Sequence, residues 1–368
     1  MIETINIRNF KKFRDAECHF TPLTLMLGGN GSGKSSVAQS LLLLYQSAND
    51  GSLNRSMLNL SGELCNLGTG RDVLHEGAGS AEKLFFSYEF ENNETASIEC
   101  EYKSEADSLP ISSEILPSSI DLLKTKRLRF LSADRFGPRL TMPWVRALAS
   151  RGEIGMRGEG ALAVFAGIKN HRIASTDPRN ASGKDQTLGD TLQTYLDGIS
   201  PGARLEVSSY GNMDSVSGTF QYTSADGVLT NAFRPTNVGF GLSYCIPIIV
   251  LCLTAQRGDI VIIENPEAHL HTSAQIKIAD LLERTARSGV QVIVETHSRE
   301  IFHTLRRRVH EKHVEPRLIS ANYFYVNDAA NNAESTAFHV PEIDSGMGEW
   351  PEDFRQSYGG NLDFHYMA

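Results

Sequence analysis

One glycine-rich stretch constrains this chain more than any other feature of its sequence. Residues 28–35 read Gly-Gly-Asn-Gly-Ser-Gly-Lys-Ser and fit the pattern G-x-x-x-x-G-K-[ST] in full. An apolar run at residues 23–27 precedes this stretch, and residues 36–44, which end in four leucines, follow it. A strand, a glycine loop and a helix in this order are typical of a phosphate-binding loop. The pattern predicts an α/β fold that binds a nucleoside triphosphate.

This stretch, which we call the phosphate loop, carries the groups that a triphosphate needs. Its glycines let backbone N–H groups crowd around phosphate oxygens, and the start of the next helix adds partial positive charge. We expect Lys34 to contact the β- and γ-phosphates and the Ser35 hydroxyl to hold Mg²⁺. The predicted nucleotide contacts in the loop are Gly28, Asn30, Gly31, Ser32, Gly33, Lys34, Ser35 and Ser36.

Composition narrows the class of protein. The formal net charge of −9 argues against a protein that coats nucleic acid, although a local basic groove stays compatible with it. The five cysteines lack metal-binding spacing, which is typical of free thiols in a reducing cytosol. The N-terminus lacks a secretion signal, and the apolar run at 245–253 is far shorter than the roughly 20 residues of a membrane span. We expect a cytoplasmic protein without membrane contact.

Apolar periodicity divides the chain into four segments of one expected domain. Residues 1–49 hold alternating strands and the phosphate loop, and residues 50–235 mix strands and helices without the sustained heptads of a coiled-coil arm. Residues 236–326 alternate strands and helices, which predicts a parallel sheet with its ligand at the carboxyl ends of the strands. Residues 327–368 form a tail. The expected fold is a parallel core sheet with an N-terminal antiparallel β subdomain and a mixed helical and β insertion.

Several elements can be placed by pattern. Strands at 84–91 and 97–103 should pair as a hairpin, and Asp226-Gly227 marks a turn after two further strands at 205–209 and 218–223. A helix should run from about residue 272 to 287, capped by Thr272 or Ser273 and stopped by Gly289. Trp350 is expected to anchor the tail by packing.

A second glycine-rich helix start lies at residues 237–243, Asn-Val-Gly-Phe-Gly-Leu-Ser, which we call the signature segment. A helix N-terminus of this kind is a ready anion site. A single chain does not need two anion sites for one triphosphate. Two chains that face each other head to tail do need both sites, because the second site of each chain then covers the nucleotide of the other. The residues expected to do so are Gly239, Gly241 and Ser243.

Polar residues end two neighbouring strands of the predicted core. Glu264 ends the strand at 259–263 and is placed to hold Mg²⁺, directly or through water. His297 ends the next strand, where its imidazole could sense the γ-phosphate. With Asn265 and Glu267 in the turn that follows Glu264, these are the candidate catalytic residues.

Together these motifs resemble the ABC-type ATPases, in the branch with the SMC, RecF and overcoming-lysogenization-defect (OLD) proteins. More narrowly, N-V-G-F-G-x-S, I-E-N-P-E-A-H-L-H and the late G-x-E-W-P-x-x-F look like a bacterial family of ABC-type ATPases with a short C-terminal domain of unknown function, whose relatives occur in anti-phage defence operons. The resemblance implies an ABC-type nucleotide-binding fold. The stretches that look like Walker A, the signature, Walker B, the D-loop and the switch histidine are 28–35, 237–243, 261–264, 268–271 and 296–298.

The resemblance leaves the general base open. ABC proteins usually end Walker B with Asp and then Glu, and the Glu polarises the attacking water. Here Glu264 falls at the metal position and Asn265 at the base position. An amide cannot accept a proton, so either Glu267 takes the role or turnover is slow.

For function, the resemblance implies a cytoplasmic ATPase that uses ATP and Mg²⁺ and forms a head-to-tail homodimer, or a higher oligomer, on ATP. It would act as a conformational switch on a separately encoded effector such as a nuclease or toxin. The alternative is a RecF-like clamp that binds DNA through the basic segment 135–184, with nine Lys or Arg against three acids. A transporter's nucleotide-binding subunit is a third reading, and it fits least because the signature is divergent. Intrinsic nuclease chemistry is not expected, because the residues after His297 lack clustered acids.

Overall fold

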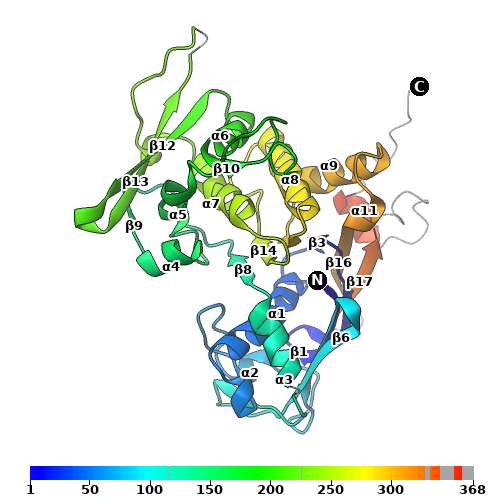
Figure 1. Cartoon of the computed structure of the whole chain (residues 1–368). Coiled ribbons are helices and arrows are strands. Elements are labelled where there is room, and N and C mark those ends of the chain that lie inside the picture. The colour runs from blue at the N-terminus through cyan, green and yellow to red at the C-terminus, as the bar shows by residue number, and fades with distance from the viewer. Residues whose placement is uncertain (116, 225, 328–331, 340–351, 359–368) are drawn as a thin grey trace. The chain divides into compact units, whose positions relative to one another are not determined.

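The fold was established in a computed structural model of the chain (Figure 1). The residues whose structure it describes are 1–115, 117–224, 226–327, 332–339 and 352–358. The chain packs into two compact units: unit 1 is Met1–Thr125 with Arg306–Ala368, and unit 2 is Lys126–Leu305. The division of a single domain into four segments stays a prediction, and the expected role of Trp350 concerns a residue outside the described ones.

Unit 1 contains the N-terminal antiparallel subdomain that the sequence predicted, a four-stranded sheet in the order β2-β1-β5-β6. Strand β1 (Ile2–Phe10) pairs with β2 (Phe13–His19) on one side and with β5 (Leu84–Phe90) on the other. The isoleucines of β1, which alternate with polar residues, are buried. Strand β6 (Glu94–Cys100) begins before residue 97, because the hairpin turn is the single 3₁₀ turn Glu91–Asn93.

The phosphate loop of unit 1 joins β3 (Leu23–Gly28) to α1 (Lys34–Asn49), as expected. Every residue of β3 is buried, which is typical of a parallel strand covered on both faces. Strand β3 pairs in parallel with β16 (Ile319–Asn327), and β16 pairs antiparallel with β17 (Asn332–His339). The other elements of the unit are β4 (Met57–Asn59), α2 (Gly70–Val73), β7 (Ser108–Pro110), α3 (Pro117–Thr125) and α11 (Glu352–Tyr358).

Unit 2 is built on three parallel strands, in which β14 (Ile260–Glu264) lies between β8 (Leu128–Leu131) and β15 (Gln291–Glu295). In their register, Glu264 is opposite Glu295 and Ile263 is opposite Leu131. The residues that follow the three strands therefore meet at one edge of the sheet. The helices that accompany these strands are α7 (Phe240–Thr254), α8 (Thr272–Arg287) and α9 (Arg299–His310).

Two helices of unit 2 differ in detail from expectation. Helix α7 is the buried core helix that its apolar run predicted, and it continues through Pro247. Helix α8 begins at Thr272, and its N-cap is His271, whose Nδ1 accepts from the Ser273 N–H. The expected caps, Thr272 and Ser273, were wrong because histidine is not among the preferred cap residues. Among the described residues, none of the helices combines the length and the apolar character of a membrane span.

The rest of unit 2 is the mixed helical and β insertion. Strands β12 (Ala203–Tyr210) and β13 (Ser215–Tyr222) confirm two expected strands, and β9 (Met142–Pro143) completes their sheet in the order β12-β13-β9 (Figure 1). Among the described residues after the turn at Asp226-Gly227, Leu229 and Phe233 form isolated β-bridges. Phe233 pairs with Phe220 in β13, and Leu229 pairs with Thr223, directly after β13. The other elements are α4 (Arg146–Arg151), α5 (Ala161–Ile168), β10 (Arg172–Ile173), β11 (Gln186–Thr187) and α6 (Leu188–Ile199).

Candidate active site

In unit 1, the backbone of the phosphate loop requires glycine at two positions. Gly28 and Gly33 have φ angles of 138° and 106°, in the region that L side chains rarely adopt. A Cβ atom at Gly28 would overlap the carbonyl oxygen of Phe324, and one at Gly33 would overlap the ring of Phe13. These glycines let the loop lie close to its neighbours and turn its backbone into the first turn of α1.

The loop surrounds the side chain of Lys34. This side chain is 3% exposed, and its Nζ donates to the carbonyl oxygens of Gly28 and Gly29 at 3.0 and 2.7 Å. The Ser32 hydroxyl also donates to the Gly29 carbonyl, at 2.9 Å. An ammonium held by carbonyl dipoles in a glycine loop is well suited to a phosphate group, which offers it charged acceptors instead.

In unit 2, the segment after β8 holds the end of β14. The Glu264 carboxylate accepts through Oε2 from the Ala133 N–H at 2.9 Å and from the Ser132 hydroxyl at 3.4 Å. Its other oxygen, Oε1, accepts no hydrogen bond from the described residues. Glu264 is therefore a fixed carboxylate with one oxygen open to a further ligand.

Arg135 is a site residue that the sequence reasoning missed, because it counted only as one cation of the basic segment. It is 2% exposed and donates to the carbonyl oxygens of Glu264 and Asn265 at 2.7 and 2.6 Å. Its guanidinium lies 5.6 Å from the centroid of the Tyr244 ring. Burial lowers the pKa of Arg135, and the Glu267 carboxylate opposes that shift. One signal in the sequence could have indicated this role, because Arg135 follows closely after β8, the strand that neighbours β14.

Asn265 occupies a special backbone position. Its φ of 44° is left-handed, a conformation that asparagine tolerates better than most residues. Its N–H donates to the Glu295 carbonyl at 2.8 Å, and its carbonyl accepts from Arg135. The position that aligns with the catalytic Glu of ABC proteins is thus a sharp turn in this chain.

Glu267 connects the turn after β14 to the end of β15. Its Oε2 accepts from the Thr296 hydroxyl at 2.7 Å and its Oε1 from the His297 N–H at 2.8 Å. Thr296 is buried, whereas His297 is exposed. The structure therefore brings together at one sheet edge the four residues Glu264, Asn265, Glu267 and His297, as their order on parallel strands predicted.

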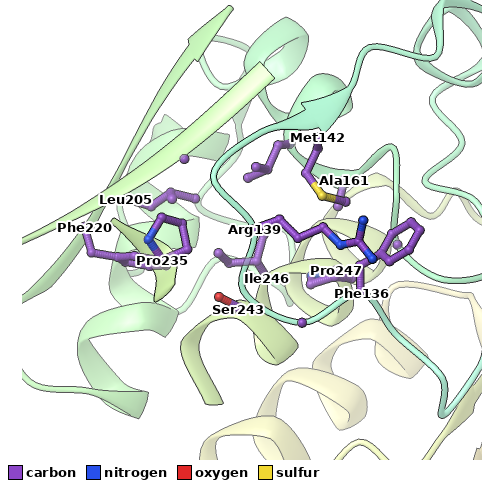
Figure 2. Close-up of a pocket in the computed structure, with 14 residues that line it drawn as sticks. Phe136, Arg139, Met142, Ala161, Leu205, Phe220, Pro235, Ser243, Ile246 and Pro247 are labelled. Carbon is purple, nitrogen blue, oxygen red and sulfur yellow. The ribbon is translucent and has the colours of Figure 1, made fainter. Parts of the chain in front are cut away.

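The signature segment packs against the same turn. Phe240 and Tyr244 at the start of α7 lie with ring centroids 5.6 and 4.6 Å from that of His269. A Cβ at Gly241 would lie only 2.8 Å from the His269 carbonyl oxygen. Ser243 is on the first turn of α7 and lines a pocket next to it (Figure 2).

The basic segment 135–184 is partly neutralised within unit 2. Arg135 is buried against carbonyls, and four of the other cations make ion pairs with carboxylates. The paired residues are Arg146 with Asp214, Arg151 with Glu153, Arg157 with Asp134 and Arg179 with Asp177. The segment therefore offers far less free positive charge than its composition suggests.

The residues present fit Mg²⁺ as the metal. Among the described residues, no group of three or more His, Cys, Asp or Glu side chains is placed to hold a metal ion. Mg²⁺ needs no such cage, because it is typically held by one or two protein groups together with phosphates and water. Considered separately, unit 1 offers the Ser35 hydroxyl at the start of α1, and unit 2 offers the open oxygen of Glu264.

Solved structures with the same fold were found at low sequence identity. An SMC head bound to the C-terminal winged-helix domain of ScpA is 14% identical, with a TM-score of 0.58, and the match covers 94% of this chain and 99% of that one. A Pyrococcus furiosus Smc head with an extended coiled coil, bound to the C-terminal domain of ScpA, is 12% identical, with a TM-score of 0.52 and 94% and 98% coverage. No curated protein matches the chain.

The fold is that of the ABC-like, SMC-head ATPases, and together with the phosphate loop it confirms the predicted resemblance. Within that class, residues 23–302 match the family described as "AAA domain, putative AbiEii toxin, Type IV TA system". The match spans well over half of the chain, and the chain belongs to this family.

Proposed function

We propose that this chain binds ATP with Mg²⁺, hydrolyses it slowly, and pairs head to tail with a second copy while ATP is bound. The observation that carries the proposal is the buried Lys34 inside a complete phosphate loop, in a chain whose family and fold are those of ATPases. Lys34 binds the β- and γ-phosphates, and the loop N–H groups bind the remaining phosphate oxygens.

Ser35 and Glu264 are the residues that hold Mg²⁺, which supplies neutralising charge for the phosphates when it is bound. Ala133 and Ser132 keep the Glu264 carboxylate in one orientation, and Arg135 keeps the turn that follows it in shape. The chain thereby presents a metal-binding oxygen at the end of a rigid strand.

Slow turnover follows from the groups around the attacking water. Asn265 can orient a water molecule but cannot accept its proton. Both oxygens of Glu267 already accept hydrogen bonds from the segment of Thr296 and His297. We propose that Glu267 chiefly holds His297 in place to sense the γ-phosphate, and that no strong general base speeds the reaction.

The signature segment supplies the second half of each site from the other copy. Gly239, Gly241 and Ser243 are proposed to cap the γ-phosphate there, as a helix start with open N–H groups can. Because the segment packs on the turn that follows Glu264, closure of one site reaches the metal-binding region of the other.

We propose further that ATP-driven pairing controls a separate effector protein, such as a nuclease or toxin, in anti-phage defence. The family description links this kind of AAA domain to a toxin–antitoxin system, a setting in which such control would operate. SMC heads that bind ScpA provide a precedent for a partner protein on this fold. The DNA-clamp alternative lacks a comparable observation, and four of the nine cations in the basic segment are paired with carboxylates.

The proposal is tested by replacing Lys34. Lys34→Ala removes a charge-assisted contact worth about 1.5–3 kcal/mol, so ATP affinity should fall by about 10- to 150-fold. Calorimetry with ATP and Mg²⁺, together with steady-state phosphate release, measures both effects. Lys103→Ala, an exposed lysine of the same unit, is the control. Unchanged affinity and turnover in Lys34→Ala would show that the phosphate loop is not the nucleotide site.

A further inference from the structure

Arg139 is a cation beside the signature segment to which nothing above assigns a role. We propose that Arg139 is a further catalytic residue, which contacts the phosphates of the nucleotide bound by the second copy, next to Ser243. This inference rests on the proposed head-to-tail pairing and adds to it a positive charge that acts between copies.

The segment that contains Arg139 runs along the start of α7. Arg135 lies over the Tyr244 ring, and a Cβ at Gly137 would lie 3.5 Å from Phe240 and 3.6 Å from Tyr244. Arg139 and Ser243 line the same pocket (Figure 2). Whatever group Ser243 meets from outside this chain is therefore near Arg139 as well.

Arg139 and Arg157 differ in whether a carboxylate balances their charge. Two guanidinium groups contact the ring of Phe136, that of Arg139 at 4.2 Å and that of Arg157 at 4.4 Å from its centroid. Arg157 is neutralised by Asp134, at 3.0 Å. Arg139 makes no ion pair with any carboxylate of the described residues, and it is exposed. The chain thus orients Arg139 on an aromatic ring and leaves its charge available to an anion from outside.

The guanidinium group of Arg139 is chemically suited to bind phosphate. A guanidinium that stacks on a ring by its face keeps its N–H edge open, and that edge suits two phosphate oxygens at once. Most of the pocket wall beside it is apolar, formed by residues such as Met142, Leu205, Phe220 and Ile246. A less polar wall strengthens the attraction between a cation and the charge that develops on the transferred phosphoryl group.

The test uses variant pairs. Arg139→Ala alone should bind ATP normally and lose about 10²-fold or more in turnover. Arg157→Ala, which removes the neutralised cation on the same ring, should lose less than about fivefold. An equal mixture of Arg139→Ala and Lys34→Ala, each nearly inactive alone, should recover roughly a quarter of wild-type turnover. Half of the dimers are then mixed, and each mixed dimer has one complete site.

A second mixture, Lys34→Ala with Ser243→Ala, separates failure of the inference from failure of the proposed function. Recovery in both mixtures supports Arg139 as a residue that acts on the other copy, and it also shows that the Arg139→Ala chain folds. Recovery only with Ser243→Ala, or wild-type turnover by Arg139→Ala alone, would overturn the role of Arg139 and leave the paired site standing. Recovery in neither mixture would overturn the head-to-tail site and this inference with it.

Discussion

Glu267 is the residue whose role the structure changes most. A free carboxylate at this position could serve as a general base, and the sequence alone left this role open between Glu267 and slow turnover without a base. In the structure both of its oxygens are engaged, with the Thr296 hydroxyl and the His297 N–H. A glutamine has the same shape and can keep an acceptor for His297, whereas alanine keeps neither contact.

This difference gives a prediction for two substitutions. Glu267→Gln should lose less than about tenfold in turnover, because general-base catalysis, worth about 10²–10⁴-fold, is not what it removes. Glu267→Ala should lose much more, because the end of β15 is released. Single-turnover hydrolysis at saturating ATP measures the step itself, and ATP affinity and melting temperature serve as controls. Equal losses of 10²-fold or more in both variants would make Glu267 the base.

At the scale of elements, the approach of α7 to the turn after β14 depends on Gly241. A Cβ there would lie 2.8 Å from the His269 carbonyl and 3.0 Å from the Leu270 side chain. The His269 carbonyl belongs to the backbone and cannot move without disturbing the turn that Arg135 and Glu267 hold. The contact therefore joins the signature segment to the turn after β14, where Mg²⁺ binding is proposed.

We predict that Gly241→Ala lowers turnover by about tenfold or more while ATP affinity stays unchanged, because the substitution displaces the signature segment and not the phosphate loop. The control is Gly167→Ala in α5, where an added Cβ meets no atom within 4 Å. That change should leave turnover intact and stabilise its helix by up to about 1 kcal/mol. A Gly241→Ala protein with wild-type turnover would show that the contact carries no coupling.

The elements themselves were largely predictable, and the contacts between them were not. Apolar periodicity was enough to predict β3, α1, β14, α8 and β15. The parallel topology was enough to predict that Glu264 and His297 lie at one edge of the sheet. The left-handed turn at Asn265 and the pairing of Glu267 with Thr296 depend on residues 29 or 30 apart meeting in space. Local sequence patterns do not predict such contacts, so Arg135 and Arg139 were interpreted only as members of the basic segment.

At the scale of the whole molecule, all five cysteines are free thiols, of which four are buried and Cys65 is partly buried. Burial raises the pKa of Cys65, Cys100 and Cys245 to about 12 and that of Cys252 to about 11, from an ordinary value of 9.0. A thiol reagent at pH 8 should therefore label these four cysteines only after the chain unfolds.

The same shifts predict how stability depends on pH. The pKa values of these thiols are higher in the folded chain than in the unfolded chain. Their contribution to the free energy of unfolding is therefore complete below pH 9 and is lost as pH rises through about 11 to 12. Urea unfolding at pH 8 and pH 10.5, with thiol labelling in parallel, measures both effects. Rapid labelling of Cys100, Cys245 and Cys252 in the native protein at pH 8 would contradict the burial that the structure shows.

The central claim is that ATP joins two copies of this chain, and sedimentation velocity tests it most directly. With Mg²⁺ and a hydrolysis-resistant ATP analogue, the wild-type protein should shift from monomer to dimer. Ser243→Arg should bind the analogue with wild-type affinity and stay monomeric, because its bulky charged side chain blocks only the face that meets the other copy. A wild-type sedimentation coefficient that the analogue leaves unchanged at saturating concentration would contradict the account.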